Sequence, residues 1–167
     1  FEAARILRDE GHPVVLYCVG GPEQRAERLS ARAKAENLES HLCFPGSIPF
    51  SEIPPTLAAM DVCLIPDTQD WSSPTKFFEF AAMERPIVGS RSPSTVEVFG
   101  PPPNQAGLLF ERGSARDMVN QILRVVNDPD LARRLGQTAR RRVLEHYTWD
   151  VSVRKIEELY RAIGAPV

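Results

Sequence analysis

The sequence predicts an α/β protein in which a doubly wound parallel sheet is flanked by helices. Short apolar segments alternate with longer segments whose apolar residues recur every three or four positions, as in successive βαβ units. The short segments are apolar throughout, which is typical of central parallel strands that are covered on both faces. With 167 residues, of which 43% are hydrophobic, the chain suits a single domain.

The N-terminal part is expected to contain two helices and two strands. An amphipathic helix over residues 1–10 precedes a strand at 14–19, and a polar helix over 23–36 precedes a strand at 42–44. Doubly wound domains usually begin with a strand, whereas this sequence begins inside a helix. We therefore expect residues 1–167 to be one domain of a longer protein, with at least one strand and its loop before Phe1.

Three further strands and their helices should occupy the middle of the chain. Ser51 is suited to cap a helix that runs to Met60. The elements expected after it are a strand at 62–65, a helix from about 75 to 84, a strand at 86–89, a short helix at 94–99, a proline-rich loop at 100–105 and a strand at 107–110.

The last part of the chain should be helical. Ser114, Asp128 and Thr148 each precede an apolar stripe and are suited to cap a helix. The stripe expected to pack in the final helix consists of Val153, Ile156, Leu159, Tyr160 and Ile163. Five arginines on the preceding helix are expected to form a solvated face: Arg133, Arg134, Arg140, Arg141 and Arg142.

Composition excludes several classes of function. The net charge is −2 and the pI is about 6.0, which argues against nucleic acid as a partner. No apolar segment approaches the roughly 20 residues that span a bilayer. The histidines at 12, 41 and 146 are scattered, so no metal site is expected. The cysteines, Cys18, Cys43 and Cys63, each fall in an expected strand, which indicates reduced core thiols in a cytoplasmic protein.

The carboxyl ends of the expected strands carry the polar residues of interest. They are Gly20-Gly21, Pro45-Gly46-Ser47, the segments from Pro66 and from Ser90, and the segment after Phe110. Parallel strands bring these ends to one edge, where open α/β sheets bind ligands. The segment 66–83 leads from a strand through a polar loop into a helix that carries Glu79, a geometry that holds phosphates or sugars. An ordinary strand-to-helix connection is the alternative.

Several separated segments together resemble one family. They are Val19-Gly20-Gly21-Pro22-Glu23, Leu42-Cys43-Phe44-Pro45-Gly46-Ser47-Ile48-Pro49, the segment 57–66, the segment 73–88 with its Ser-Pro-Thr-Lys-Phe-Phe-Glu sequence, Gly107-Leu108-Leu109-Phe110, Asp128-Pro129, Leu135-Gly136 and His146-Tyr147-Thr148-Trp149. In this order they resemble the C-terminal, donor-binding half of a GT-B glycosyltransferase, close to family 4 of the retaining enzymes. The resemblance implies a Rossmann-like sheet with a helical C-terminus.

The resemblance also implies roles for residues at the strand ends. Glu79 would bind the ribose hydroxyls of a nucleotide, since one carboxylate can accept hydrogen bonds from two hydroxyls. Backbone amides of Ser72, Ser73 and Thr75 would bind the diphosphate, and Lys76 would reach a phosphate or remain a surface lysine. The turn of Gly20 and Gly21 and the segment of Gly46, Ser47 and Ile48 would complete the site, the latter against the nucleobase.

Some residues depart from the family pattern. The glutamate expected eight residues before Glu79 is Trp71, with Asp70 beside it as a substitute. Glu84 stands where a glycine is common, and Ser92-Pro93-Ser94-Thr95 replaces a glycine-rich turn.

The implied activity is retaining transfer from a UDP- or GDP-sugar to an acceptor bound by an N-terminal domain that precedes Phe1. No cofactor or metal is implied, and the cations that neutralise the leaving group are expected before Phe1, so the chain alone should be inactive. The full-length protein would be cytoplasmic, with peripheral association with the inner face of a membrane left open. A non-catalytic module with a degenerate site is the alternative function, and a flavodoxin-like or receiver domain is a weaker third.

Overall fold

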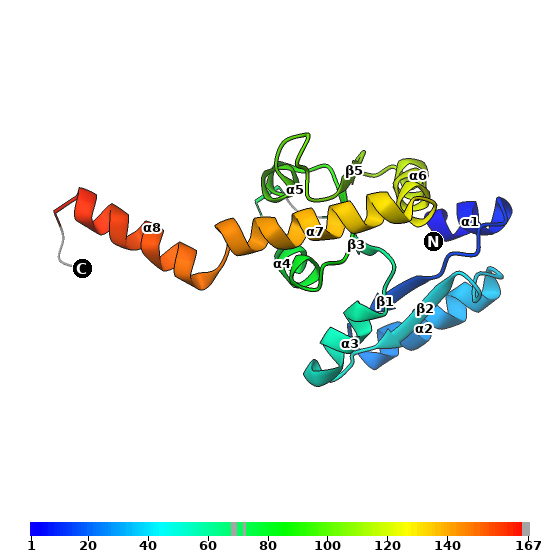
Figure 1. The fold of residues 1–167 in the computed structure, drawn as a ribbon. Coiled ribbons are helices and arrows are strands. Elements are labelled where there is room, and N and C mark those ends of the chain that lie inside the picture. The colour runs from blue at the N-terminus through cyan, green and yellow to red at the C-terminus, as the bar shows by residue number, and fades with distance from the viewer. Residues whose placement is uncertain (68–69, 72, 165–167) are drawn as a thin grey trace.

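Five parallel strands form the centre of the structure (Figure 1). The computed structural model describes residues 1–67, 70–71 and 73–164. Strands β1 (Leu16–Val19) and β2 (Leu42–Gly46) form one sheet, and β3 (Cys63–Ile65), β4 (Ile87–Ser90) and β5 (Leu108–Phe110) form another in the order β3-β4-β5. Every pairing is parallel, which confirms the expected fold class and places the carboxyl ends of the strands at one edge within each sheet.

Helices connect the strands as the apolar spacing predicts. Their bounds are α1 (Glu2–Asp9), α2 (Glu23–Ala35), α3 (Ile53–Ala58) after the 3-10 turn η1 (Phe50–Glu52), α4 (Thr75–Ala82), α5 (Pro93–Phe99), α6 (Ala115–Val126), α7 (Pro129–His146) and α8 (Trp149–Ala162). Ser114, Asp128 and Thr148 accept hydrogen bonds from backbone amides at the starts of α6, α7 and α8, as predicted. The expected cap at Ser51 is wrong, because a 3-10 turn occupies residues 50–52 and Glu52 precedes α3.

The three-stranded sheet is covered on both faces. Successive residues of β4 point to opposite faces, and Ile87 packs in a cluster with Phe77 and Phe80 of α4. Val88 packs in a different cluster with Ile122 of α6. The sheet therefore has α4 on one face and α6 on the other, the doubly wound arrangement that the sequence predicts.

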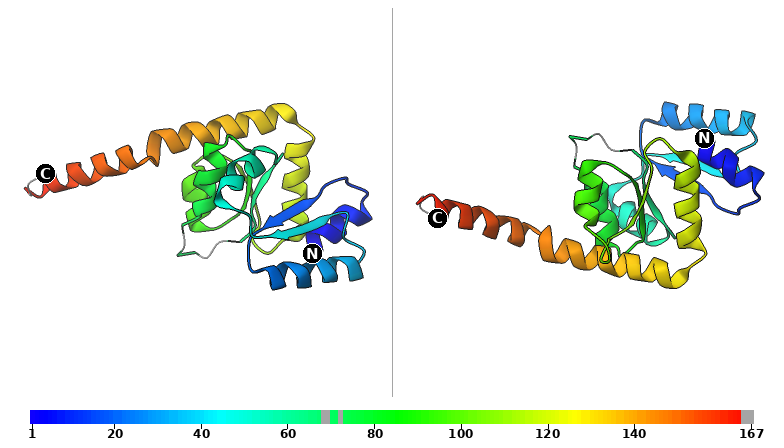
Figure 2. Two further views of the ribbon diagram at one scale, coloured as in Figure 1. Left: turned by 90° about the horizontal axis from the view of Figure 1, so that it is seen from below. Right: turned by 90° about the horizontal axis from the view of Figure 1, so that it is seen from above.

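The two sheets do not pair with each other within the described residues. β1 is hydrogen-bonded only to β2, and β3 only to β4. As a result, apolar side chains of the β1 segment face solvent, including Tyr17, which is 41% exposed. Figure 2 shows β1 and β2 set apart from β3 in both views. The unpaired edges of β1 and β3 are called the opening between β1 and β3 below. They include the carboxyl ends of these two strands, which lead into the candidate site.

The cysteines only partly match their expected role. Cys63 is buried, and desolvation raises the pKa of its thiol to about 12, so it is an inert core thiol. Cys43 is half-buried. Cys18 is exposed, which corrects the expectation that it lies in the core. The reason is that β1 has a strand partner on one side only.

Helix α8 extends away from the rest of the molecule (Figures 1 and 2). None of its residues is buried, and Ile156 is 54% and Leu159 63% exposed. The expectation that the stripe of Val153, Ile156, Leu159, Tyr160 and Ile163 packs within this chain is therefore wrong. The helix has the predicted amphipathic pattern, but the described residues offer no surface for its apolar face. No helix in the described part of the chain is long and apolar enough to cross a membrane.

Candidate functional site

The first part of the candidate site joins the ends of β1 and β2. The backbone amide of Gly20 donates to the carbonyl of Gly46 at 2.7 Å, and the Ser47 hydroxyl donates to the carbonyl of Gly21 at 2.9 Å. The φ angles of Gly20, Gly21 and Gly46 are +112°, +86° and +77°, values that other residues rarely adopt. The structure thus brings together four of the residues predicted from the two glycine turns, and half-buried Ile48 follows them.

The second part is helix α4 with Glu79. The helix begins at Thr75, after the loop that leaves β3, as the sequence predicts. The Glu79 side chain is 47% exposed, so its carboxylate is directed to solvent and not into the core. Lys76 Nζ lies 3.1 Å from Glu79 Oε2, which makes a surface ion pair one turn apart on the helix. The two predicted residues therefore occupy the same patch.

The loop between β3 and α4 is connected to the loop after β5. Arg112 Nε donates to Asp67 Oδ1 at 3.2 Å, and Arg112 Nη1 donates to Asp70 Oδ1 at 2.8 Å. Asp70, the predicted substitute for the missing family glutamate, is thus engaged with a guanidinium. Trp71 beside it is 85% exposed. The predicted amide donor Ser72 lies outside the described residues.

The start of α4 uses some of its own donors. The Thr75 amide donates to the Ser73 carbonyl at 2.9 Å, and the Phe77 amide donates to the Pro74 carbonyl at 2.8 Å. Thr75 therefore has an internal acceptor, whereas the prediction gave its amide to a diphosphate.

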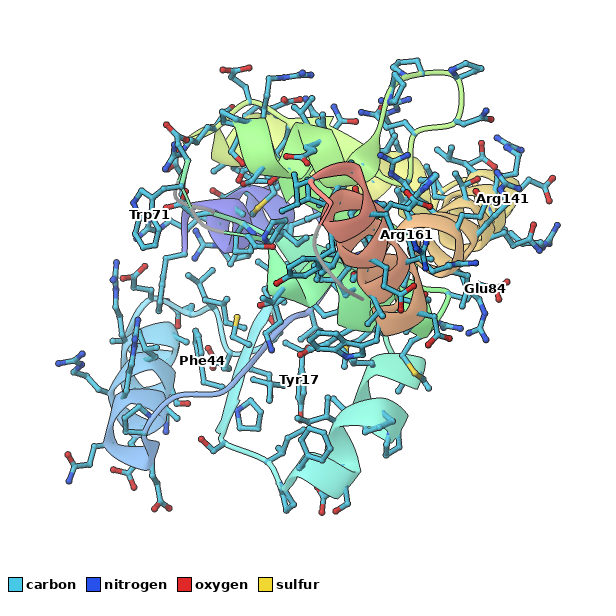
Figure 3. All side chains as sticks on the ribbon, turned by 90° about the vertical axis from the view of Figure 1, so that its left-hand side faces the viewer. Tyr17, Phe44, Trp71, Glu84, Arg141 and Arg161 are labelled. Carbon is cyan, nitrogen blue, oxygen red and sulfur yellow. The ribbon has the colours of Figure 1, made fainter. Side chains whose placement is uncertain are left out.

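The glycine turns and the α4 region remain two separate clusters. Among the described residues, no hydrogen bond or ion pair joins them, and the opening between β1 and β3 separates the strands that carry them. Two surface hollows of about 370 and 270 Å³ lie along α7 instead, the first lined by Glu84 and Arg141 among others. In Figure 3, Glu84 and Arg141 lie on the opposite side of the molecule from Trp71.

Arg112 is the residue of this region that sequence reasoning missed. It comes two residues after β5, and the segment after Phe110 was among the expected strand ends. The available signal was therefore a cation at a strand end, but its partners come from a loop far away in the sequence. The described residues contain no group of His, Cys, Asp or Glu side chains that could hold a metal ion.

The backbone conformation of Glu84 explains why the family pattern often has a glycine at this position. Its φ is +56°, in the left-handed region that favours glycine. The Glu84 amide donates to the Ala81 carbonyl and the Arg85 amide to the Phe80 carbonyl, at 3.0 and 3.1 Å. These two bonds are a Schellman motif, in which the residue after the helix is usually glycine.

Replacing Glu84 by glycine should therefore stabilise the chain by about 0.5–1 kcal/mol, since glycine has no steric cost in this conformation. Chemical denaturation of both proteins measures the change. Asn37→Gly is the matched control, because Asn37 has a φ of +53° in the same motif after α2 and asparagine tolerates that region. A gain at Asn37 equal to that at Glu84 would contradict the explanation.

Comparisons with known proteins agree with this architecture. The family described as "Glycosyl transferases group 1" matches residues 1–128. The 2-deoxystreptamine N-acetyl-D-glucosaminyltransferase of Streptomyces fradiae is 26% identical over an alignment of 150 residues, and the match covers 82% of this chain and 35% of that protein. The chain thus spans about a third of the length of this relative.

Solved structures show the same fold. HepE of Anabaena, in complex with UDP, superposes with a TM-score of 0.75 at 18% identity, over 89% of this chain and 41% of HepE. The C-terminal domain of LpcC, a group 1 glycosyltransferase family protein of Francisella tularensis, superposes with a TM-score of 0.68 at 17% identity, over 89% of this chain and 77% of that one. The chain belongs to the group 1 glycosyltransferase family and has the fold of a GT-B C-terminal domain.

Proposed function

We propose that this domain binds the nucleoside diphosphate of a UDP- or GDP-sugar at the carboxyl ends of its strands, for retaining transfer of the sugar to an acceptor. The observation that carries the proposal is the exposed Glu79 carboxylate on α4, directly after the loop that leaves β3. Family membership supports it, as do the complexes of the structurally similar HepE with UDP and with UDP-glucose. UDP is therefore the first nucleotide to test.

The chemistry assigned to Glu79 is recognition of a vicinal diol. An ionised carboxylate accepts hydrogen bonds from both ribose hydroxyls, and such charge-assisted bonds are stronger than neutral ones. Lys76 already lies beside this carboxylate and would move toward a phosphate when the ribose takes its place. The positive end of the α4 dipole favours the diphosphate at the same position.

We propose that a preceding part of a longer protein completes the domain. A strand between β1 and β3 would pair with both free edges and join the two sheets, and a right-handed crossover through α1 would lead from it to β1. The same preceding part would carry the acceptor site and the cations that stabilise the departing diphosphate. We therefore expect weak nucleotide binding and no transfer by residues 1–167 alone. Reduced cysteines suit transfer in the cytoplasm.

Replacing Glu79 by glutamine should weaken UDP binding about tenfold or more, because a hydrogen bond to a charged group contributes about 1.5–3 kcal/mol. Isothermal titration calorimetry with UDP and with GDP measures the effect and identifies the preferred base. Glu157→Gln is the matched control, since Glu157 is also a helical glutamate paired with a cation, Arg161, and has a half-buried side chain on α8 that is 37% exposed. Its affinity should equal that of the unchanged protein.

Two results would contradict the proposal in different ways. Equal affinity of Glu79→Gln and the unchanged protein would remove Glu79 from the ribose site. Absence of binding of both UDP and GDP by the longer protein would favour the alternative of a non-catalytic module that has kept only the fold. A thermal shift provides an independent readout, since a ligand at 100 times its dissociation constant adds about 2.7 kcal/mol.

A further inference from the structure

We propose that Arg112 is a positioning residue that holds Asp67 and Asp70, which lie between β3 and α4, in the arrangement that receives the nucleotide. The proposal rests on the proposed function of this edge. Arg112 contacts two carboxylates of the loop, with Nε 3.2 Å from Asp67 Oδ1 and Nη1 2.8 Å from Asp70 Oδ1.

The sheet order makes Arg112 a bridge across the site. β4 lies between β3 and β5, so a side chain that starts after β5 and reaches the loop after β3 spans the carboxyl end of β4. Among the described residues of the loop, these two ion pairs are its side-chain contacts with another loop. The loop leads directly into α4, and Glu79 lies on that helix. Restraint of the loop therefore restrains the approach to the ribose site.

The backbone around Arg112 is itself anchored. The amide of the preceding residue, Glu111, donates to Asp117 Oδ2 at 2.6 Å, and the Ser114 hydroxyl accepts from the Asp117 amide at 3.1 Å. The loop after β5 is thereby tied to the first turn of α6. The Arg112 side chain therefore extends from an anchored backbone. Its two hydrogen bonds hold Asp67 and Asp70 in place relative to α6.

The chemistry of the side chain suits two acceptors at once. A guanidinium presents donors in a planar fork, whereas the ammonium of lysine is a single compact charge. The Arg112 side chain is 37% exposed and each aspartate is 66% exposed. Pairs with this exposure contribute little to global stability. We therefore expect Arg112 to restrain this loop locally and to change the free energy of unfolding of the domain very little.

The test compares UDP affinity and loop order in a set of variants. Arg112→Ala should weaken UDP binding about three- to tenfold, and Arg112→Lys should weaken it less. Amide hydrogen exchange without nucleotide should be faster at Asp67, Asp70 and Trp71 of Arg112→Ala and unchanged in β4. Arg133→Ala is the matched control, because Arg133 forms an exposed pair with Asp130 on α7, and it should behave as the unchanged protein.

The double variant Asp67→Asn/Asp70→Asn separates positioning from direct contact. If Arg112 acts through the aspartates, this variant loses UDP affinity and loop protection as Arg112→Ala does. If it instead binds UDP more tightly, Arg112 is a phosphate ligand that the aspartates restrain, and the positioning role is wrong. Unchanged exchange in Arg112→Ala would also overturn the role. Lack of UDP binding by the unchanged protein would count against the proposed function, while the exchange result still decides whether Arg112 orders the loop.

Discussion

Replacing Phe77 by alanine should lower the free energy of unfolding by about 3–5 kcal/mol, the usual cost of removing a buried aromatic ring. Phe77 has no exposed surface. Its ring centroid lies 5.6 Å from that of Phe99 on α5 and 6.4 Å from that of Tyr147, which follows α7. The cavity left by alanine would therefore open where α4 meets the sheet and two other helical elements.

Thermal and urea denaturation measure this effect, and the midpoint should fall by about 10 °C for a domain of this size. Phe50→Ala is the control, because Phe50 is 86% exposed and its removal should change stability by less than about 0.5 kcal/mol. If both variants lose the same small amount, Phe77 does not anchor α4. Because α4 carries Glu79, a destabilised Phe77→Ala protein should also lose nucleotide affinity at temperatures well below its midpoint.

Replacing Gly136 by alanine should cost about 3 kcal/mol, at the upper end for a side chain added to a filled core. A Cβ atom at this position would overlap with the carbonyl oxygen of Glu84 and lie 2.9 Å from its carbonyl carbon. Both are backbone atoms, so no side-chain rotation relieves the contact and α7 must move away from the end of α4. The same Glu84 forms the Schellman motif, which leaves its carbonyl little freedom to move.

Denaturation of Gly136→Ala and of Gln137→Ala provides the comparison. Gln137 is the next residue of α7 and is exposed, so alanine there should be neutral or slightly stabilising through its helix propensity. An increase in stability for Gly136→Ala, as propensity alone would give in an open helix, would show that α7 does not lie against Glu84 as closely as the structure places it.

The sequence predicted the fold because each element carried a local signal. Continuous apolar segments marked the strands, and capping residues such as Ser114 and Asp128 marked helix starts within one residue. The expected packing of α8 failed for the opposite reason. Its amphipathic stripe shows which face of the helix is apolar, but a stripe does not reveal whether the surface that covers it lies in the same chain. The exposure of Cys18 has a similar origin, since strand composition does not show whether a neighbouring strand is present.

The candidate site was predictable only in part. Glu79 and the glycine turns follow directly from their places after strands, and the structure puts them there. The pairing of Arg112 with Asp67 and Asp70 depends on the order β3-β4-β5, which brings together residues that are 42 or more positions apart. No local pattern encodes that contact.

The opening between β1 and β3 has a consequence for the domain as a separate molecule. Backbone groups along two inner edges can pair with a strand from another molecule as readily as with one from the same protein. Tyr17 and its apolar neighbours would line that contact, so edge-to-edge pairing between two copies is an expected route to aggregation. The strand that we propose between β1 and β3 would block this pairing as well as join the two sheets.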